Sequence, residues 1–142
     1  MQTTYEPSRE LKVGDTASMS KQISDEDVRV FADISGDRNP VHLDDEFAAT
    51  TIFQKRIVHG ALSGALISAV LGMLMPGPGT IYLSQTINFK APVFIDETIT
   101  AWLEVTAYRA DKRIATIKTQ VFNQEDKLVL EGEAVVIAPP LK

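Results

Sequence analysis

Two side chains that can exchange protons lie close together in the first third of the chain. Asp37 and His42 are five residues apart in the stretch S-G-D-R-N-P-V-H. Pro40 fixes its own φ and pushes the preceding Asn39 out of helical geometry, so no helix continues through this stretch. Both side chains are therefore predicted to project from a stiff loop. A carboxylate and an imidazole that face one space can add or remove water by general acid–base chemistry.

A purely structural interpretation of the same residues stays open at this point. Asp and Asn are common turn formers because their side chains bond nearby backbone groups. His42 precedes three acidic residues at positions 44–46, which is also typical of a solvated loop that enters a helix. A short motif of this kind carries a high risk of a chance match. Further motifs elsewhere in the chain, described below, favour the catalytic interpretation.

The segments around this stretch are predicted to set its position. Ser24 with Asp27 three residues later approximates a capping box, and apolar residues follow at helical spacing. Gly36 falls where a helix C-cap belongs, so the chain leaves a helix just before the candidate loop. Asp44 or Asp45 can cap a second short helix.

A long apolar run follows and predicts a central helix from Ile57 to about Met75. Its length reaches that of a membrane span. Glycines, serines and His59 dilute its hydrophobicity, however, and alternating Pro and Gly residues end it, so we expect a helix buried inside a soluble protein. Its small residues indicate either close packing against a sheet or the approach of a ligand, and both explanations stay open. They are Gly60, Ala61, Gly64, Ala65, Ala69 and Gly72.

The rest of the chain shows strand patterns. Apolar and polar residues alternate from Ile81 to Phe89. Further strands are predicted over 98–108, 113–122 and 128–138, and a weaker one over 11–19 opens the chain. An early strand, then helices, then four consecutive strands predicts an α+β fold with an antiparallel sheet and one buried helix. Residues 1–142 are expected to form one domain.

The composition excludes several classes of function. The hydrophobic fraction of 44% and the charged fraction of 23% are those of an ordinary soluble globular protein. A net charge of −5 argues against nucleic acid and anionic membranes as partners. There is no cysteine, which excludes disulfides, thiol catalysis and cysteine zinc sites. The N-terminus lacks the pattern of a signal peptide, so a cytoplasmic location is expected.

The stretch S-G-D-R-N-P-V-H, preceded by Phe31 and followed by Ala48, resembles the signature of the MaoC-like (R)-specific enoyl-CoA hydratases. The resemblance continues through F-A-A-T-T-I-F, I-V-H-G, I-N-F-K-A-P-V-F and G-E-A-V-V, and so covers nearly the whole chain. It implies the hot-dog fold, in which an antiparallel five-stranded sheet wraps around a long central helix. It also implies a hydro-lyase that adds water, reversibly, to a short-chain trans-2-enoyl-CoA and forms the (R)-3-hydroxyacyl-CoA.

The resemblance assigns the two proton transfers to Asp37 and His42, and we place Asp37 as the principal base for water. The N–H of Gly60 is expected to polarise the thioester carbonyl, because N–H groups in the first turn of a helix lack intrahelical partners. His59 is expected to order the loop rather than to react. Ser68 is expected to be a supporting hydrogen-bond partner near Asp37, and a local structural role for it is equally open.

The remaining expectations concern ligands and partners. Asn39 is expected to contact the substrate. Leu71 and Val136 are expected to close the acyl pocket, which favours enoyl groups of about four to six carbons. No metal and no cofactor are expected besides the coenzyme A of the substrate, and the His and Asp spacing matches no zinc pattern. The resemblance also implies a homodimer.

Two other functions are weighed against the hydratase. A hot-dog acyl-CoA thioesterase would cleave the acyl bond, and the intact Asp–His pattern argues against it. A non-catalytic acyl-CoA-binding module has no need for a paired acid and base. The pathway stays open between polyhydroxyalkanoate synthesis and fatty-acid metabolism, where the enzyme could also run as a dehydratase.

Overall fold

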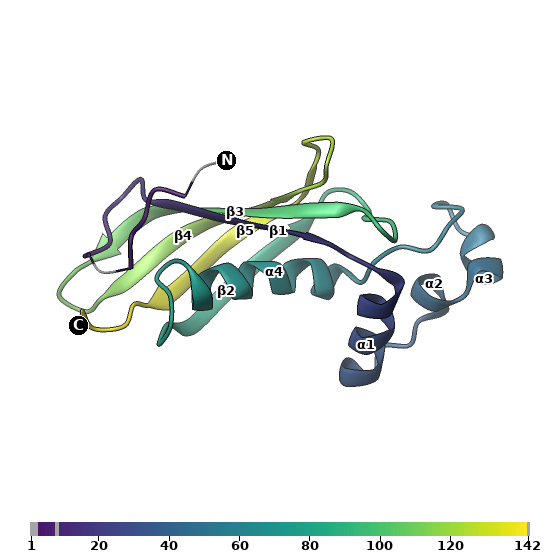
Figure 1. Ribbon diagram of the computed structural model, residues 1–142, viewed down its shortest axis with the longest axis horizontal. Coiled ribbons are helices and arrows are strands. Elements are labelled where there is room, and N and C mark those ends of the chain that lie inside the picture. Colours follow the sequence, from purple (N-terminus) through teal and green to yellow (C-terminus); the bar gives the residue numbers. More distant parts are fainter. Residues whose placement is uncertain (1–2, 8, 142) are drawn as a thin grey trace.

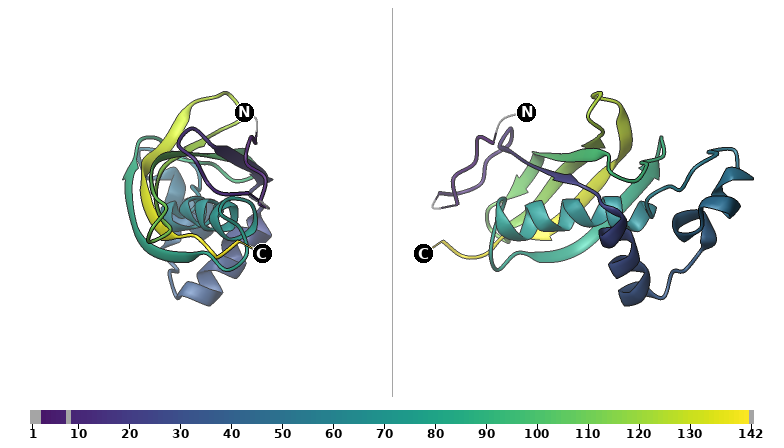
Figure 2. Two further views of the ribbon diagram at one scale, coloured as in Figure 1. Left: turned by 90° about the vertical axis from the view of Figure 1, so that its left-hand side faces the viewer. Right: turned by 45° about the vertical axis from the view of Figure 1, so that its right-hand side comes forward.

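The computed structural model describes residues 3–7 and 9–141, so the ends of the predicted domain 1–142 lie outside the described residues. In chain order the elements are β1 (Thr16–Gln22), α1 (Asp25–Ser35), α2 (Pro40–Leu43), α3 (Asp45–Ala49), α4 (Gly60–Met73), β2 (Ile81–Phe89), β3 (Thr98–Arg109), β4 (Ile114–Phe122) and β5 (Leu128–Ile137). The strands form one antiparallel sheet in the order β1-β3-β4-β5-β2. The sheet curves around α4, as the end-on view in Figure 2 shows. The predicted α+β architecture is confirmed.

Helix α4 forms the centre of the core because it is apolar on nearly all sides, and residues at helical spacing face the sheet. Its buried residues are Ser63, Leu66, Ile67, Val70 and Leu71. The apolar ones belong to the same buried cluster as inward-facing strand residues such as Leu103 and Ile117. Each fully buried side chain of this kind contributes roughly 1.5–3 kcal/mol relative to an exposed one. No helix in the described part of the chain is long and apolar enough to cross a bilayer.

The central helix starts later than predicted. Ile57 forms an isolated antiparallel bridge with Phe94, and the N–H of Val58 donates to the carbonyl of Val93 at 2.7 Å. These residues are therefore extended, because they pair with the segment that joins β2 to β3. Sequence pattern alone could not reveal this pairing, since the partner lies more than thirty residues away. As a result, α4 begins at Gly60.

The first strand also starts later than the predicted position 11. Residues 11–15 form a turn in which Gly14 has a φ of +94°. Asp15 is buried in this turn and accepts two hydrogen bonds from the Arg9 guanidinium, at 2.6 and 2.9 Å. Burial alone would raise the pKa of Asp15, but the bonds from Arg9 and from the Lys12 N–H lower it below its usual value. A buried ion pair thus holds the turn, and β1 begins only at Thr16.

Helices α1, α2 and α3 lie beyond one end of the sheet, at the right of Figure 1. The predicted capping box is present at the start of α1, where Ser24 and Asp27 bond each other's backbone N–H groups. Gly36 ends α1 in the left-handed conformation with a φ of 79°. Asp44 caps α3 by accepting from two N–H groups of its first turn. All three caps are confirmed.

The segment at Pro40 differs from the expected loop. Residues 40–43 form the single helical turn α2, so His42 lies on a helix rather than in a loop. Proline is well suited to the first position of a helix, because its φ is already helical and no N–H is left unpaired. The side chain of Asn39 caps this turn by accepting from the Val41 N–H at 3.1 Å. Gly36 therefore ends one helix, and Pro40 starts the next.

Strand β2 forms one edge of the sheet. A shift in its register with β5 interrupts the predicted period-two alternation. Of the expected apolar face only Ile87 packs against the core, whereas Ile81, Leu83 and Phe89 stay 54%, 50% and 59% exposed. The single chain thus leaves an apolar edge uncovered. The opposite edge, β1, is partly covered, because its first residue accepts hydrogen bonds from the N–H groups of Thr4 and Tyr5.

Gly132 on β5 is required by the close approach of β2. A Cβ at this position would lie 1.7 Å from the carbonyl oxygen of Thr86. Gly132→Ala is therefore expected to lower the free energy of unfolding by about 3 kcal/mol or more, measured by urea denaturation. Gly72→Ala is the matched control. A Cβ there meets nothing within 4 Å, so the helix propensity of alanine is expected to add about 0.5–1 kcal/mol. Equal stability of the two variants would contradict this account.

Candidate active site

Asp37 lies in the exposed segment that follows helix α1. After the left-handed turn at Gly36, the N–H of Asp37 donates to the hydroxyl of Ser35 at 3.1 Å. The carboxylate oxygen Oδ1 accepts from the N–H of Asn39 at 3.3 Å. The Ser35 hydroxyl therefore holds the backbone of Asp37, and the Asn39 N–H orients its carboxylate.

His42 is held by the segment that leads into α4. Its side chain is largely buried, and Nδ1 lies 2.7 Å from the carbonyl oxygen of Ile57. A carbonyl oxygen can only accept, so Nδ1 carries a proton and Nε2 of the neutral ring is an acceptor. In return, the N–H of Ile57 donates to the carbonyl of Val41 at 3.2 Å. The ring is thereby fixed in one orientation and one tautomer.

His59 precedes α4 and is only 1% exposed. Its ring stacks on that of His42, with the centroids 3.9 Å apart and the planes at 30°, and the ring of Phe31 lies 4.8 Å away. Nε2 lies 2.9 Å from the backbone carbonyl oxygen of Asp37 and donates to it. Nδ1 is buried with no hydrogen-bond partner among the described residues. His59 thus fixes the backbone of the Asp37 segment, as a loop-ordering residue should.

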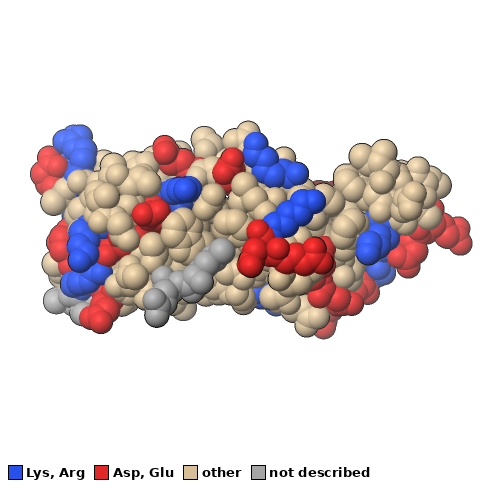
Figure 3. Space-filling model, turned by 90° about the horizontal axis from the view of Figure 1, so that it is seen from above, with Lys and Arg blue, Asp and Glu red and all other residues tan. Residues whose placement is uncertain are grey.

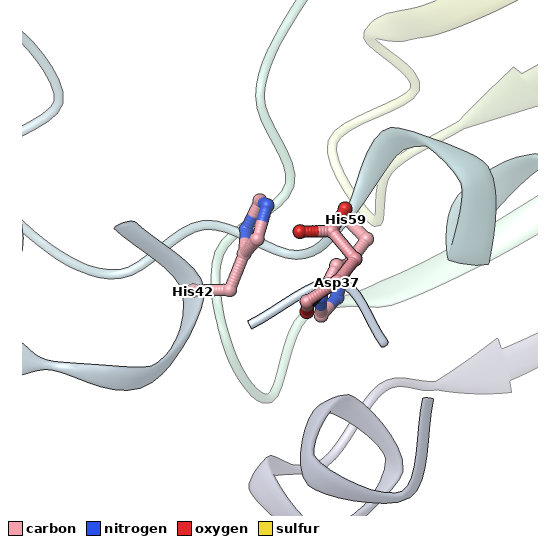
Figure 4. A group of neighbouring side chains, drawn as sticks. All are labelled: Asp37, His42 and His59. Atoms are coloured by element: carbon pink, nitrogen blue, oxygen red, sulfur yellow. Dashed lines mark hydrogen bonds between the residues drawn. The ribbon is translucent and has the colours of Figure 1, made fainter. Parts of the chain in front are cut away.

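Asp37, His42 and His59 form one cluster (Figure 4). One carboxylate oxygen or ring nitrogen of each lies within 4.8 Å of the others. The structure therefore brings together the carboxylate and the imidazole that the sequence singles out. The same three groups could be considered as metal ligands, but a tetrahedral zinc needs its ligand atoms only about 3.3 Å apart. The stacked imidazoles also face each other with their planes, not with their lone pairs. The arrangement suits proton transfer better than metal binding.

Burial lowers the pKa of His42 below its usual value. The bond with the Ile57 carbonyl and the Asp37 carboxylate raise this pKa, whereas the nearby His59 and Arg56 lower it, and the net shift is downward. His42 therefore stays neutral at pH values where an exposed histidine is partly protonated. A neutral ring keeps the lone pair of Nε2 available.

Gly60 is the first residue of α4, and its N–H has no acceptor among the described residues. The ring of Phe89 lies against this glycine so closely that a Cβ would come within 2.6 Å of the ring. Gly60 also lines a cavity of about 450 Å³, with Ser63, Phe89 and Lys90 among its other walls. An unpaired N–H at a helix N-terminus attracts negative charge. This cavity therefore has a donor ready for a carbonyl oxygen.

Comparison with known proteins agrees with this geometry. The family model of the MaoC like domain matches residues 6–127 of the chain. The chain belongs to the MaoC-like family. It is 50% identical over 129 residues to an (R)-specific enoyl-CoA hydratase of Aeromonas caviae, which covers 91% of this chain and 96% of the relative. A second (R)-specific enoyl-CoA hydratase, of Rhodospirillum rubrum, is 46% identical over 130 residues, which covers 92% of this chain and 90% of the relative.

A solved structure extends the match to three dimensions. The (R)-hydratase from A. caviae involved in polyhydroxyalkanoate (PHA) biosynthesis superimposes on this chain with a TM-score of 0.88 at 50% identity. The match covers 91% of this chain and 98% of that one. The hot-dog fold that the sequence motifs imply is therefore confirmed for this MaoC-like domain.

The remaining predicted contacts lie away from the cluster. Ser68 is exposed on α4, on the opposite side of the helix from Ser63 and Val70, which are buried. Its role as a hydrogen-bond partner near Asp37 stays a prediction. Leu71 and Val136 are buried in the core, and neither lines the cavity. Asn39 caps α2, and its contact with substrate stays a prediction.

Two residues of this MaoC-like domain escaped the sequence reasoning. Ser63 lines the cavity, and its spacing of three residues from Gly60 could have placed both on one side of the helix. Arg56 is buried against the backbone of His42, to whose carbonyl oxygen its Nε donates at 2.7 Å. Its only signal in the sequence was its place beside Lys55, which does not tell a buried cation from an exposed one.

The lowered pKa of His42 has a consequence for stability. In the unfolded chain a histidine titrates near pH ~6.5. Just below that pH, His42 therefore binds a proton in the unfolded chain but not in the folded one. The free energy of unfolding is therefore expected to fall as the pH drops through about 6.5, until the folded pKa is reached. His42→Gln should flatten this part of the curve, measured by urea denaturation between about pH 8 and about pH 5. An equal decline in the variant would contradict the lowered pKa.

Proposed function

We propose that this MaoC-like domain is an (R)-specific enoyl-CoA hydratase, a hydro-lyase that adds water to a short-chain trans-2-enoyl-CoA. The observation that carries this is the Asp37–His42 pair beside the N-terminus of α4, in a chain 50% identical to an (R)-specific enoyl-CoA hydratase. The product is the (R)-3-hydroxyacyl-CoA. The reaction is reversible, because water is both added and eliminated by the same two groups.

The proton path follows from the tautomer of His42. Because Nδ1–H donates to the Ile57 carbonyl, Nε2 is free to accept one hydrogen of the attacking water. This bond holds the water oxygen toward C3 of the enoyl group. The Asp37 carboxylate takes the other hydrogen as the C3–O bond forms. The electron pair of the double bond moves toward the thioester carbonyl, and C2 then takes the proton back from Asp37. Both groups act from one side, so the hydroxyl and the proton arrive on the same face.

The charge that develops on the thioester oxygen needs a donor. The N–H of Gly60 is free for this purpose, and the dipole of α4 adds to it. A donor of this kind is typically worth roughly a 100- to 1000-fold rate increase. The cavity that contains Gly60 would hold the arm of coenzyme A, and Lys90 on its wall would meet a phosphate. On the face seen in Figure 3, basic and acidic side chains are interspersed, so a local cation rather than a broad basic surface would serve this role.

The test of the function is hydration of crotonyl-CoA, followed by loss of the enoyl absorbance. Asp37→Asn and His42→Gln are each expected to lower kcat by about 100- to 10,000-fold while the far-UV circular dichroism stays unchanged. Asp45→Asn, an exposed aspartate on α3, is the control and should keep wild-type activity. A folded Asp37 or His42 variant with wild-type kcat would remove the proposed roles. An (S) product would exclude the proposed hydratase, and release of free thiol would favour a thioesterase.

We also propose a homodimer joined along β2. The edge of this strand is unpaired in the single chain, and its exposed side chains include Ile81, Tyr82 and Leu83. An uncovered apolar strand of nine residues is a template for pairing with a second copy. Antiparallel pairing of two β2 strands would join the two sheets edge to edge.

Leu83→Lys tests this interface because it places a charge on the proposed contact. Sedimentation at micromolar concentration is expected to give a dimer for the wild type and a monomer for the variant. Val13→Lys is the control, since Val13 is 62% exposed in the turn before β1 and lies outside the β2 edge. A wild-type monomer, or an unchanged dimer in the Leu83 variant, would argue against the β2 interface.

A preference for enoyl groups of about four to six carbons is part of the proposal. Leu71 and Val136 lie in the core beyond the cavity, so their truncation would extend the space available to an acyl tail. Leu71→Ala or Val136→Gly is expected to raise kcat/KM for an eight-carbon substrate relative to a four-carbon one by about tenfold. If both variants lose stability and all activities in parallel, these residues are core residues only.

The cellular setting is proposed on the same basis. One structural relative is involved in PHA biosynthesis, and we propose that this chain supplies (R)-3-hydroxyacyl-CoA to that process or to fatty-acid metabolism. We further propose a cytoplasmic location and no cofactor besides the coenzyme A of the substrate.

A further inference from the structure

Arg56 is a buried cation that the proton path does not use. Its side chain is only 9% exposed. Nε donates to the backbone carbonyl of His42 at 2.7 Å, and Nη2 forms an ion pair with Asp25. Burying a guanidinium costs several kcal/mol unless it is paired and hydrogen-bonded. The two partners therefore hold the buried guanidinium in one defined position.

These two partners belong to the two elements that carry the reacting groups. Asp25 is the first residue of α1, which ends at Gly36 directly before Asp37. His42 lies on α2. One guanidinium therefore connects the start of the helix that leads to the carboxylate with the backbone of the imidazole. Asp25 is anchored further by Arg29, whose Nε lies 3.0 Å from its other oxygen.

We propose that Arg56 is a positioning residue for the hydration reaction. By bonding the carbonyl of His42 and the carboxylate of Asp25, it fixes α1 and α2 at the separation that places Asp37 beside Nε2 of His42. This inference rests on the proposed roles of Asp37 and His42.

The charge of Arg56 also acts on the imidazole. The groups that face His42 are the Ile57 carbonyl and the Asp37 carboxylate, which favour its protonation, and His59 and Arg56, which oppose it. Loss of the guanidinium therefore raises the pKa of His42. Because only the neutral ring accepts a hydrogen from water, the acid limb of the kcat–pH profile then moves to higher pH. A general loss of folded protein would lower the rate equally at every pH and leave this limb in place.

Arg56→Met removes the charge and both hydrogen bonds while it keeps much of the apolar stem. The expected result with crotonyl-CoA is a fall in kcat of about 10- to 100-fold, with KM changed less than about threefold. Arg56→Lys keeps the charge and part of the bonding, so its kcat should lie between those of the wild type and Arg56→Met. Arg29→Met is the matched control, because it takes a cation from the same Asp25 without a contact to His42, and it should behave as wild type.

A second readout does not depend on catalysis. The chain has only two histidines, so the ring signals of His42 can be followed by NMR as the pH is changed. The His42 midpoint is expected to rise in Arg56→Met and to stay in place in Arg29→Met. An unchanged midpoint together with wild-type kcat would overturn the proposal. If Arg56→Met does not fold, the kcat of Arg56→Lys decides, because lysine keeps the charge but loses part of the bonding, and a wild-type kcat would overturn the proposal. Should Asp37→Asn and His42→Gln keep their activity, the proposed catalytic roles fail, while the NMR midpoint still reports on Arg56.

Discussion

The hydrogen bond from Nδ1 of His42 to the carbonyl of Ile57 is the bond that fixes the imidazole where two parts of the molecule meet. One part is the sheet with its central helix, and the other is the group of three helices beyond the end of the sheet. Since Ile57 itself pairs with Phe94, the imidazole is linked through two steps to the segment before β3. The orientation of the His42 ring thus depends on the sheet rather than on its own helical turn. This is why a turn as short as α2 can hold it.

The two groups proposed to react, Asp37 and His42, differ in their surroundings, and the difference has a physical origin. His42 is buried against His59, so a positive charge on both rings would place two cations 3.9 Å apart in a poorly solvated site. Asp37 is exposed, and its carboxylate is in contact with water. A neutral imidazole leaves the lone pair of Nε2 free to accept a hydrogen from a water molecule. The surroundings of His42 thus favour the neutral ring before any substrate arrives.

The fold could be predicted from patterns that are local in sequence. The errors arose where a segment pairs with residues that are distant in sequence. Caps at Ser24, Gly36 and Asp44 were predictable because each rests on contacts within a few residues. The start of α4 was not, since residues 57–59 are held extended by pairing with 93–94. The Asp–His pair was visible as a motif, but the pKa of His42 is lowered by its burial and by His59, which belongs to another segment of the chain. The exposure of Ser68 likewise depends on which side of α4 packs against the sheet, which a motif does not specify.

The exposure of the Asp37 segment also bears on the proposed assembly. Acid–base catalysis on a thioester benefits from a site closed to bulk water, yet residues 33–40 are all exposed in the single chain. Phe89 connects the exposure of the site with the sheet edge, because it lines the cavity and is also an exposed residue of β2. Pairing along β2 would cover Phe89 and press its ring toward Gly60, where the space is already too small for a Cβ. In the proposed dimer, the contact that covers the apolar edge would therefore also set the wall of the cavity beside the oxyanion donor. Assembly and catalysis would then depend on the same aromatic side chain.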